Sequence, residues 1–554
     1  MKAKRRFWNV WACAPLLVGL CLLLGLPARA ALFSAGDLRA MSDAITEIDL
    51  ERAQKLAASI DSETPQFLVE RGRMLLYLGD CVGAAAVFSN PATTESKEGA
   101  QLAGWARGCA HATAASFVVE DKARGIWLRL QDDADRVFAP FVFRVAAQAR
   151  DRIGAELGVD LPRPLRIDMV RDLFSLSAVT GLPLEAAETT GTLAVARFGR
   201  IIIISPQATR SGYHWEDTLA HELTHLLVTR ATRDRAPLWL QEGIAKREET
   251  RWREPRPFDP KDWAEQTAAR ALRQGRQVGI DKLGPSIAML PTPEAAATAY
   301  AEVQSFISFL IREQGEAALR LFFLDLKGLS VDDPNSALRS VTGYDLSAWN
   351  LRWQKSLLES SFGLAMAAPG APPPRGFDPA DLARRARLGE LLLGAGFGAE
   401  LAPVLGPGVA GAEPIFRFSQ ARAELARHDP EQAAQRLGAE TEIDGLYGPW
   451  FGLRGRLLEK TDAKAAERSF QLGLASDPLA EEVACRGRFS IGQDLDDPTF
   501  LTPAAGPGVR SNGASGASGD QAASRASGNQ AASGDQERPA WLALCEAARR
   551  RARD

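Results

Sequence analysis

The sequence has almost no excess charge, only five histidines and six cysteines, and no long hydrophobic run after its first thirty residues. Its 66 Lys and Arg residues nearly balance 69 Asp and Glu residues, so the formal net charge is -3. This balance argues against a nucleic-acid partner, which needs a strongly positive surface. The lack of further apolar runs excludes a polytopic membrane protein, and 46% hydrophobic residues exclude wholesale disorder. A chain of 554 residues is expected to form about three to four domains.

The first thirty residues have the pattern of a secretory signal peptide. Lys2 to Arg6 form a basic start, Val10 to Leu26 an apolar run, and Ala28-Arg29-Ala30 a small-residue cleavage site. We therefore predict that residues 1–30 are removed, that the mature protein is periplasmic or secreted, and that it has no membrane span after cleavage. An uncleaved anchor is the alternative, because the run from Trp8 to Leu26 could nearly span a bilayer.

Export changes the interpretation of the cysteines. Cys13 and Cys21 lie in the signal, and the mature chain keeps Cys81, Cys109, Cys485 and Cys545. An even number in an oxidising compartment favours two disulfides, although four buried free thiols are the alternative. Sequence order favours Cys81 with Cys109 and Cys485 with Cys545, and three pairings are formally possible.

Two regions have the apolar spacing of paired antiparallel helices. The first, residues 31–115, has breaks at Thr64-Pro65, Gly79-Asp80 and Asn90-Pro91. The second, residues 378–490, has helical runs at Trp450 to Glu459 and Asp462 to Ala475, and Pro478 is expected to begin the next helix. Its spacing resembles a tetratricopeptide repeat (TPR) at Gly455, Ala465, Ala466, Phe470, Leu474 and Pro478. Generic helical hairpins remain the alternative, and either type of repeat predicts a protein partner.

Between these regions the pattern is mixed. Strands are expected at Leu165 to Val170, Thr192 to Arg197 and Ile201 to Ser205, and a helix at about Asp132 to Leu157. The chain then has helical periodicity from Ser205 to about Ser361. The segment from Thr192 to Ala196 is suited to the edge of the sheet.

The chemistry of the sequence is concentrated at His221-Glu222-Leu223-Thr224-His225. Two histidines four residues apart on a helix project from the same face, so both imidazoles can bind one divalent ion, with Glu222 beside the open position. This is the HExxH motif of metallopeptidases. The alternative is a pair of helix histidines that contact backbone or solvent.

A catalytic zinc needs a third protein ligand. The run Pro237-Leu238-Trp239-Leu240-Gln241-Glu242-Gly243-Ile244-Ala245 follows, and here the sequence resembles the gluzincins, thermolysin-like zinc peptidases, and specifically the exported peptidase-MA-like family with helical repeats. The resemblance covers about Gly125 to Leu358. It implies that Glu242 is the third ligand and Glu222 the general base. The family usually has an aromatic residue shortly after the Ala, where this chain has Lys246 and Arg247.

Other residues are candidates for supporting roles. Glu248 and Glu249 are fallback ligands if Glu242 points away, although a solvated helix face explains them more simply. Tyr300, Tyr213 and His214 are candidate oxyanion donors, and the resemblance ranks Tyr300 first. A core packing role for Tyr300, and helix capping or surface exposure for His214, are the alternatives. Asp217 is close in sequence and is a candidate to accept a hydrogen bond from a metal-bound histidine, a contact that the sequence alone does not fix.

The predicted fold class is α+β: a mostly helical multidomain chain whose thermolysin-like catalytic domain, with a small mixed sheet, is flanked by helical repeats. The predicted segments are the signal peptide (1–30), N-terminal helical repeats (31–115), a metallopeptidase domain (116–360), a Pro/Gly linker (361–377), TPR-like helices (378–490), a low-complexity insert (503–536) and a C-terminal helix (538–554).

The predicted function is zinc-dependent hydrolysis of peptide or protein substrates outside the cytoplasm. Two His and one Glu suit zinc best, although cobalt or manganese could occupy the same ligands in vitro. One alternative is a helical-repeat envelope scaffold with a vestigial metal site. The other is a structural zinc with four protein ligands. The intact Glu222 argues against both.

Overall fold

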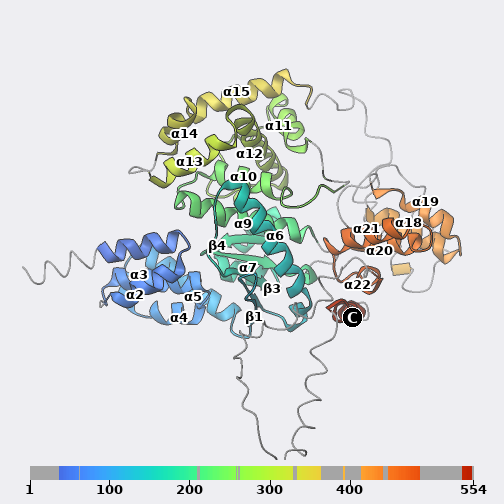
Figure 1. Ribbon diagram of the computed structural model, residues 1–554, viewed down its shortest axis with the longest axis horizontal. Helices are drawn as coiled ribbons and strands as arrows, with labels where there is room; N and C mark the ends of the chain where they lie inside the picture. Colours follow the sequence, from blue (N-terminus) through green and yellow to red (C-terminus); the bar gives the residue numbers. More distant parts are fainter. Residues whose placement is uncertain are drawn as a thin grey trace, which may run out of the picture. The chain divides into compact units, whose positions relative to one another are not determined.

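The computed structural model describes residues 36–60, 63–208, 213–256, 259, 262–328, 333–362, 388, 391–392, 414–440, 447–486 and 540–551. The predicted signal peptide, the low-complexity insert and nearly all of the predicted linker lie outside these residues. The chain divides into two compact units, Met1–Ala110 and His111–Asp554, and each is described by itself (Figure 1).

The described residues of the first unit are helical. Residues 36–46 form a helix, which is followed by α2 (Leu50–Ser59), α3 (Pro65–Leu78), α4 (Cys81–Val87), η1 (Pro91–Thr94) and α5 (Lys97–Ala112). Three of these elements begin at the predicted breaks, because Thr64, Asp80 and Asn90 each accept a hydrogen bond from a backbone N–H of the following turn. Their buried faces share a core of Met41, Ala44, Ile45, Ala53, Phe67 and Met74.

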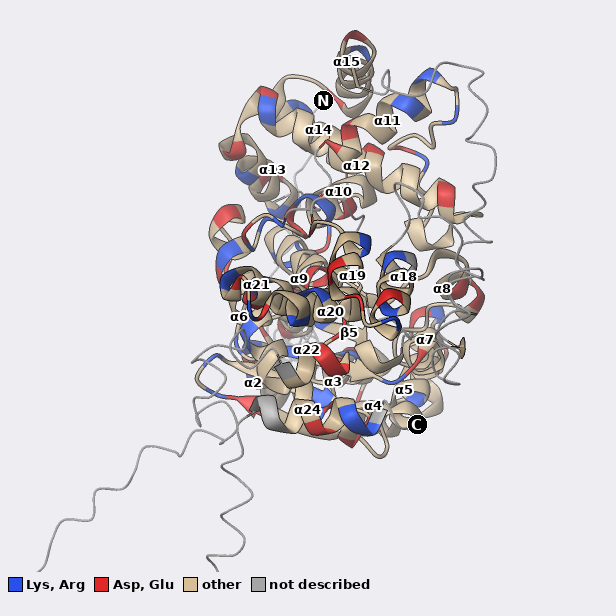
Figure 2. Ribbon diagram, turned by 90° about the vertical axis from the view of Figure 1, so that its right-hand side faces the viewer, with Lys and Arg blue, Asp and Glu red and all other residues tan. Residues whose placement is uncertain are grey.

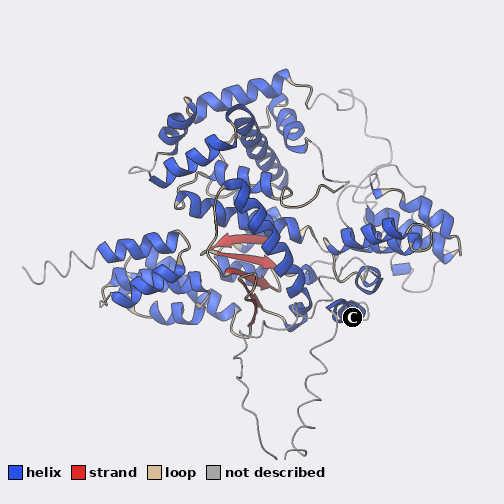
Figure 3. Cartoon of the chain, in the orientation of Figure 1, coloured by secondary structure: helices blue, strands red, loops and turns tan. Residues whose placement is uncertain are grey.

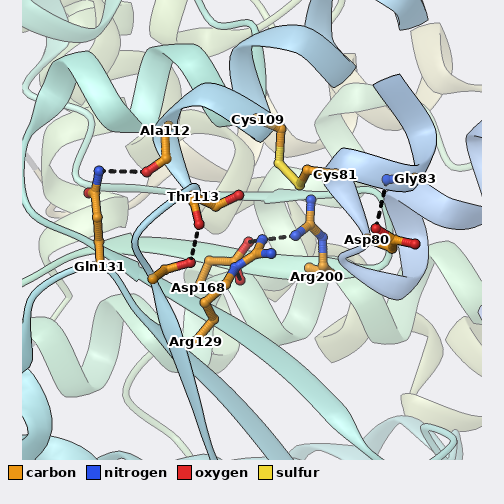
Figure 4. The surroundings of a disulfide bond; sticks show 11 residues. Asp80, Cys81, Gly83, Cys109, Ala112, Thr113, Arg129, Gln131, Asp168 and Arg200 are labelled. Atoms are coloured by element: carbon orange, nitrogen blue, oxygen red, sulfur yellow. Dashed lines mark hydrogen bonds and ion pairs between the residues drawn. A yellow bond between two sulfur atoms is a disulfide. The ribbon is translucent and has the colours of Figure 1, made fainter. Parts of the chain in front are cut away.

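Both predicted disulfides are present, so the free-thiol alternative is wrong. Cys81, at the start of α4, is joined to Cys109 of α5 (Figure 4). Cys485 of α22 (Glu481–Arg486) is joined to Cys545 of α24 (Ala540–Arg551). The second bond fastens the C-terminal helix to the helical region that precedes the low-complexity insert.

The second unit contains a five-stranded mixed sheet of strand order β1-β2-β3-β5-β4 (Figure 3). The strands are β1 (Phe117–Asp121), β2 (Ile126–Leu130), β3 (Leu165–Val170), β4 (Ala194–Arg197) and β5 (Arg200–Ile204). The outer pairs β1/β2 and β4/β5 are antiparallel, whereas β2/β3 and β3/β5 are parallel. Three strands were predicted and the first two were not. The strand expected from Thr192 begins at Ala194.

Strand β4 is an edge of this sheet, as its sequence predicts. The strand turns into β5 through Phe198 and Gly199, which both have positive φ, at 52° and 63°. Two such residues match the type I′ turn that suits a two-residue hairpin. Strand β5 is buried along its whole length, consistent with its run of four isoleucines.

Helices surround the sheet and continue beyond it. Helix α6 (Ala139–Leu157) and helix α9 (Trp215–Thr232) pack against each other and against the sheet. The prediction of a helix from about Asp132 to Leu157 is correct for α6, but the residues before it form 3-10 helix η2 (Asp133–Phe138). The remaining helices of this part are α7 (Leu173–Thr180), α8 (Leu184–Thr190), α10 (Leu238–Glu248), α11 (Trp263–Arg273), α12 (Pro293–Gln314), α13 (Glu316–Gly328), α14 (Pro334–Thr342) and α15 (Leu346–Glu359), with short 3-10 turns η3 (Pro206–Ala208) and η4 (Ile287–Met289).

Helix α12 is the centre of the helical part, because α10, α11, α13 and α15 all pack on it. Phe306 of α12 contacts Trp239 of α10 and Trp353 of α15 edge to face. Helix α10 approaches α12 at Gly243, where an added Cβ would lie 2.5 Å from the Ile307 side chain and 2.7 Å from the Val303 carbonyl oxygen. The glycine therefore allows the two helices to come this close.

The C-terminal helical region has its own core. It comprises α18 (Pro414–Ala426), α19 (Pro430–Leu437), α20 (Gly448–Leu458), α21 (Ala463–Leu474) and α22. Gly455 of α20 lies against the ring of Phe470 of α21, as the predicted close helix pair requires. The prediction that Pro478 begins the next helix is wrong. Asp477 accepts a hydrogen bond from the Leu479 N–H in a turn, and α22 begins only at Glu481.

This C-terminal region contacts the beginning of α9. The indole Nε1–H of Trp215 donates to the carbonyl oxygen of Leu474 at 3.4 Å, and the backbone N–H of Tyr213 donates to that of Ser476 at 3.1 Å. Trp215 and Ser476 are both buried. The two regions therefore form one continuous structure at this point.

The described helices carry charged residues of both signs. Figure 2 shows acidic and basic residues interspersed along them. None of the helices in the described part of the chain is long and apolar enough to cross a membrane.

Candidate metal centre

Helix α9 brings the two motif histidines together. The helix begins at Trp215, after His214, and is buried for most of its length between α6, α10 and the sheet. Because His221 and His225 are one turn apart, their Nε2 atoms lie 3.2 Å from each other. Both side chains are largely buried, with 11% and 17% of their surface exposed.

Helix α10 adds a carboxylate to this pair. The helix begins after Pro237, and Glu242 is in its second turn. Its Oε2 lies 3.6 Å from the Nε2 of His221 and 3.6 Å from that of His225. This oxygen is buried and has no hydrogen-bond partner among the described residues. A buried carboxylate oxygen without a donor is costly unless a cation satisfies it.

The three atoms fit a zinc ion. His221, His225 and Glu242 form the one cluster of metal-ligand type found in the described part of the chain. From the three separations, the point in the plane of the three atoms that is equidistant from them lies about 2.0 Å from each, close to the bond length of zinc to imidazole nitrogen and carboxylate oxygen. Two nitrogens and one oxygen are also the donors of a catalytic site that keeps one position open.

The other ring nitrogens of the histidines are held by α10. Nδ1 of His221 lies 3.1 Å from Oε2 of Glu249, and Nδ1 of His225 lies 3.2 Å from Oε1 of Gln241. In each case the Nδ1–H donates and leaves Nε2 free for a metal. Glu249 is itself held by Lys246, whose ammonium donates to both carboxylate oxygens at 2.7 and 2.8 Å.

Asp217, a candidate support for a metal-bound histidine, has other partners. Asp217 accepts hydrogen bonds from Arg253 at 2.7 Å and from the Trp252 indole at 3.2 Å. The donors that its carboxylate binds are therefore a guanidinium and an indole. Glu249, considered only as a fallback ligand, supports the histidine instead.

The electrostatics of the cluster favour a cation. Burial lowers the pKa of His221, but the neighbouring carboxylates of Glu242 and Glu249 outweigh this effect and raise it to about 10. Burial raises the pKa of Glu249, yet Lys246 and His221 lower it to about 2. Burial also raises the pKa of Glu242, but the two histidines outweigh this effect and lower the pKa below its ordinary value. The carboxylates are therefore ionised and stabilise positive charge between them.

Glu222 has a different environment. Burial raises its pKa above the ordinary value, against the opposing effect of His225 and His221. Its Oε2 accepts a hydrogen bond of 2.5 Å from the backbone N–H of Ala196 in β4. The contact fixes the carboxylate beside the edge strand, and the raised pKa brings this group closer to the range of a general base.

Tyr300 of α12 lies beside the same cluster. Its ring centroid is 6.3 Å from that of His221 and 5.6 Å from the Nζ of Lys246. Burial, together with Glu242, Glu222 and Glu249, raises the pKa of Tyr300 well above its usual value, so the hydroxyl remains a proton donor.

Two other candidates lie elsewhere. The hydroxyl of Tyr213 donates to the carbonyl oxygen of Ile204 at the end of β5, and His214 is exposed at the start of α9 without a side-chain capping bond. Glu248 is fully buried, so the prediction of a solvated face for Glu248 and Glu249 is wrong. Sequence reasoning also missed the roles of Gln241 and Lys246. For Lys246 the i, i+4 spacing from Glu242 was the available signal.

One comparison with known proteins gives a match. A family model described as the Peptidase MA superfamily matches residues 145–359, from within α6 to the end of α15. No curated protein and no solved structure matches the chain. The matched region contains α9 and α10 and supports a metallopeptidase-like fold for this part of the chain.

Proposed function

We propose that the protein is a zinc metallopeptidase of the gluzincin type that acts outside the cytoplasm. The observation that carries this proposal is the convergence of His221, His225 and Glu242 at separations that fit one zinc ion. The family match to residues 145–359 supports peptidase-like hydrolysis independently of this geometry.

Glu222 is the proposed general base. A zinc ion held by the three ligands supplies Lewis acidity, which makes water more acidic and polarises a substrate carbonyl. Glu222 takes a proton from the attacking water and later gives it to the departing amine. The N–H of Ala196 keeps the carboxylate oriented while the proton moves.

Strand β4 and Tyr300 have proposed roles toward the substrate. In an antiparallel edge strand, the backbone N–H and C=O groups of alternate residues point toward the neighbouring strand or away from the sheet. The bond from the Ile204 N–H to the Leu193 carbonyl places those of Ala194 and Ala196 outward. Since the Ala196 N–H donates to Glu222, the N–H of Ala194 and the carbonyl oxygens of both residues are the groups offered to a peptide. An extended peptide can add to this edge through backbone hydrogen bonds. The Tyr300 hydroxyl is a suitable donor to the developing oxyanion.

Two disulfides support the proposed extracytoplasmic location, because such bonds persist in oxidising compartments. The helical repeats of both units are proposed to contact a protein partner. Their role does not follow from the metal centre and needs its own binding experiment.

The test is metal content by mass spectrometry on the wild-type protein, His225→Ala and Glu222→Gln, each also offered casein and a peptide library. We expect about one zinc per chain in the wild type and in Glu222→Gln, and none in His225→Ala. Only the wild type should cleave peptides.

Other outcomes identify the alternatives. Zinc without cleavage by the wild type would favour the scaffold with a vestigial site. Unfolding on chelation, with four protein ligands and no open position, would indicate a structural zinc. Absence of zinc from every variant would refute the proposed metal centre.

A further inference from the structure

Lys246 is an unusual neighbour for a metal centre. A cation beside a divalent ion is unfavourable unless an anion stands between them. Here the ammonium donates to both oxygens of Glu249, and one of those oxygens also accepts the Nδ1–H of His221. Lys246 and Glu249 are mostly buried, at 24% and 22% exposure. The pair is therefore a fixed part of the site.

The charges explain why a cation is present. Glu222, Glu242 and Glu249 are three buried or half-buried carboxylates around one position. A divalent ion leaves one of their negative charges unbalanced, and Lys246 balances it. The ammonium also lies over the Tyr300 ring, 5.6 Å from its centroid, which holds it on this side of α10.

We infer that Lys246 tunes the metal centre: by drawing charge from Glu249, it limits electron donation through His221 and keeps a bound zinc ion strongly Lewis acidic. This inference rests on the proposed zinc site. A carboxylate that accepts the Nδ1–H of a metal-binding histidine makes the ligand more basic. An ammonium on that carboxylate opposes the effect. Lys246 is thus a positioning and tuning residue that acts through Glu249.

The inference predicts effects of opposite sign at two residues in contact. Removing the charge in Lys246→Met leaves the site with a net negative charge and a more basic His221, so zinc should bind about tenfold tighter. The same change should lower kcat with little effect on KM, because a more electron-rich ion polarises the carbonyl less. Glu249→Gln should weaken zinc binding about 10–100-fold.

The experiment measures zinc dissociation constants by competition with a fluorescent chelator, at one neutral pH, for the full-length wild type and four variants. Besides Lys246→Met and Glu249→Gln, Lys246→Arg preserves the charge and should stay near the wild-type value. Arg251→Met removes a cation near the end of the same helix, where it pairs with Glu156 and Glu248, and should leave zinc binding unchanged. Circular dichroism melts of the metal-free proteins check that each variant folds.

The results separate the inference from the proposed function. Weaker zinc binding in Lys246→Met, in parallel with Glu249→Gln, would show that the lysine only supports the carboxylate and would overturn the inference. Unchanged binding in Lys246→Met would overturn it as well. A wild type that binds no zinc would refute the proposed function itself, which is a different outcome from a zinc-binding wild type with insensitive variants.

Discussion

Two carboxylates on helix α10, Glu242 and Glu248, differ in what neutralises them. Each leaves its Oε2 buried and without a hydrogen-bond partner among the described residues. Two imidazole nitrogens face Glu242 at 3.6 Å. Glu248 instead has the guanidinium groups of Arg247 in hydrogen-bond contact and of Arg251 at 3.4 Å. In this chain, the acid of the candidate metal site therefore faces imidazole nitrogens, whereas the other buried acid faces guanidinium groups.

The pKa values of Glu242 and Glu248 also differ. Burial raises both, but the histidines lower the pKa of Glu242 below its usual value. For Glu248, burial and the neighbouring Glu156 outweigh Arg247 and Arg251 and raise the pKa to about 7. The first cluster therefore favours a bound cation, whereas the second favours a bound proton.

The largest expected effect separates the two clusters directly. Glu242→Gln should reduce zinc affinity by more than the 10–100-fold that an outer contact contributes, because it removes a charged ligand. Glu248→Gln changes the same chemical group on the same helix and should retain one zinc per chain. Competition titration of both variants checks this. Equal zinc loss in both would remove the distinction between the clusters.

The second-largest effect is expected at the cluster of His221, His225 and Glu242, beside which Tyr300 lies. Tyr300→Phe should lower kcat by about 10²–10³-fold, the contribution of one oxyanion donor, with little change in KM or zinc content. Steady-state kinetics on a cleavable peptide is the measurement. Retention of full kcat would assign Tyr300 to ring packing against His221.

A third prediction concerns stability and the proton-favouring cluster. The raised pKa of Glu248 means that the folded protein binds this proton more tightly than the unfolded chain, so wild-type stability falls as pH rises from about 4.5 to about 7. Glu248→Gln lacks this loss, so its stability relative to the wild type should rise across that window, on the order of 1–3 kcal/mol. Urea unfolding at several pH values measures it. A difference that is constant with pH would contradict the assignment.

The last prediction tests the close packing of α10, the helix that carries both clusters, against α12. Gly243→Ala puts a Cβ into the Val303 carbonyl and the Ile307 side chain, and should destabilise the protein by about 1–3 kcal/mol. Gly328→Ala is the control, because an added Cβ there meets no atom within 4 Å. Denaturant unfolding of both variants should show a loss only in Gly243→Ala. Equal stability would mean that α10 and α12 can separate without cost.

The sequence indicated the three clustered residues, His221, His225 and Glu242, better than the residues that contact them. The i, i+4 spacing of His221 and His225 is a local property of one helix, and the resemblance supplied Glu242. The contacts of Glu249 and Lys246 depend on where α10 ends and how it crosses α9. Asp217 is nearer to the histidines in sequence, but in the folded chain it accepts a hydrogen bond from Arg253. Such side-chain contacts depend on the angle at which the two helices cross, and the hydrophobic periodicity of the sequence does not give that angle.

The fold was predictable in the same uneven way. Helix starts at Thr64 and Asp80 and the buried strand from Ile201 have strong local signals. Strands β1 and β2 were missed. Strand β1 is a short edge strand that ends in two acidic residues, and its burial alternates only weakly. Its pairing with β2 is what stabilises it, and pairing is not visible in either segment alone.

The bonds from the C-terminal region to the start of α9 have a consequence for the design of shortened proteins. A version that stops after Phe362 would retain the entire region matched by the family, yet it would lose the carbonyl oxygens of Leu474 and Ser476 that accept from Trp215 and Tyr213. Those two donors lie six and eight residues before His221. Loss of activity in such a fragment would therefore be no measure of partner binding by the helical repeats, since the fragment would also have lost the contacts that hold the start of α9.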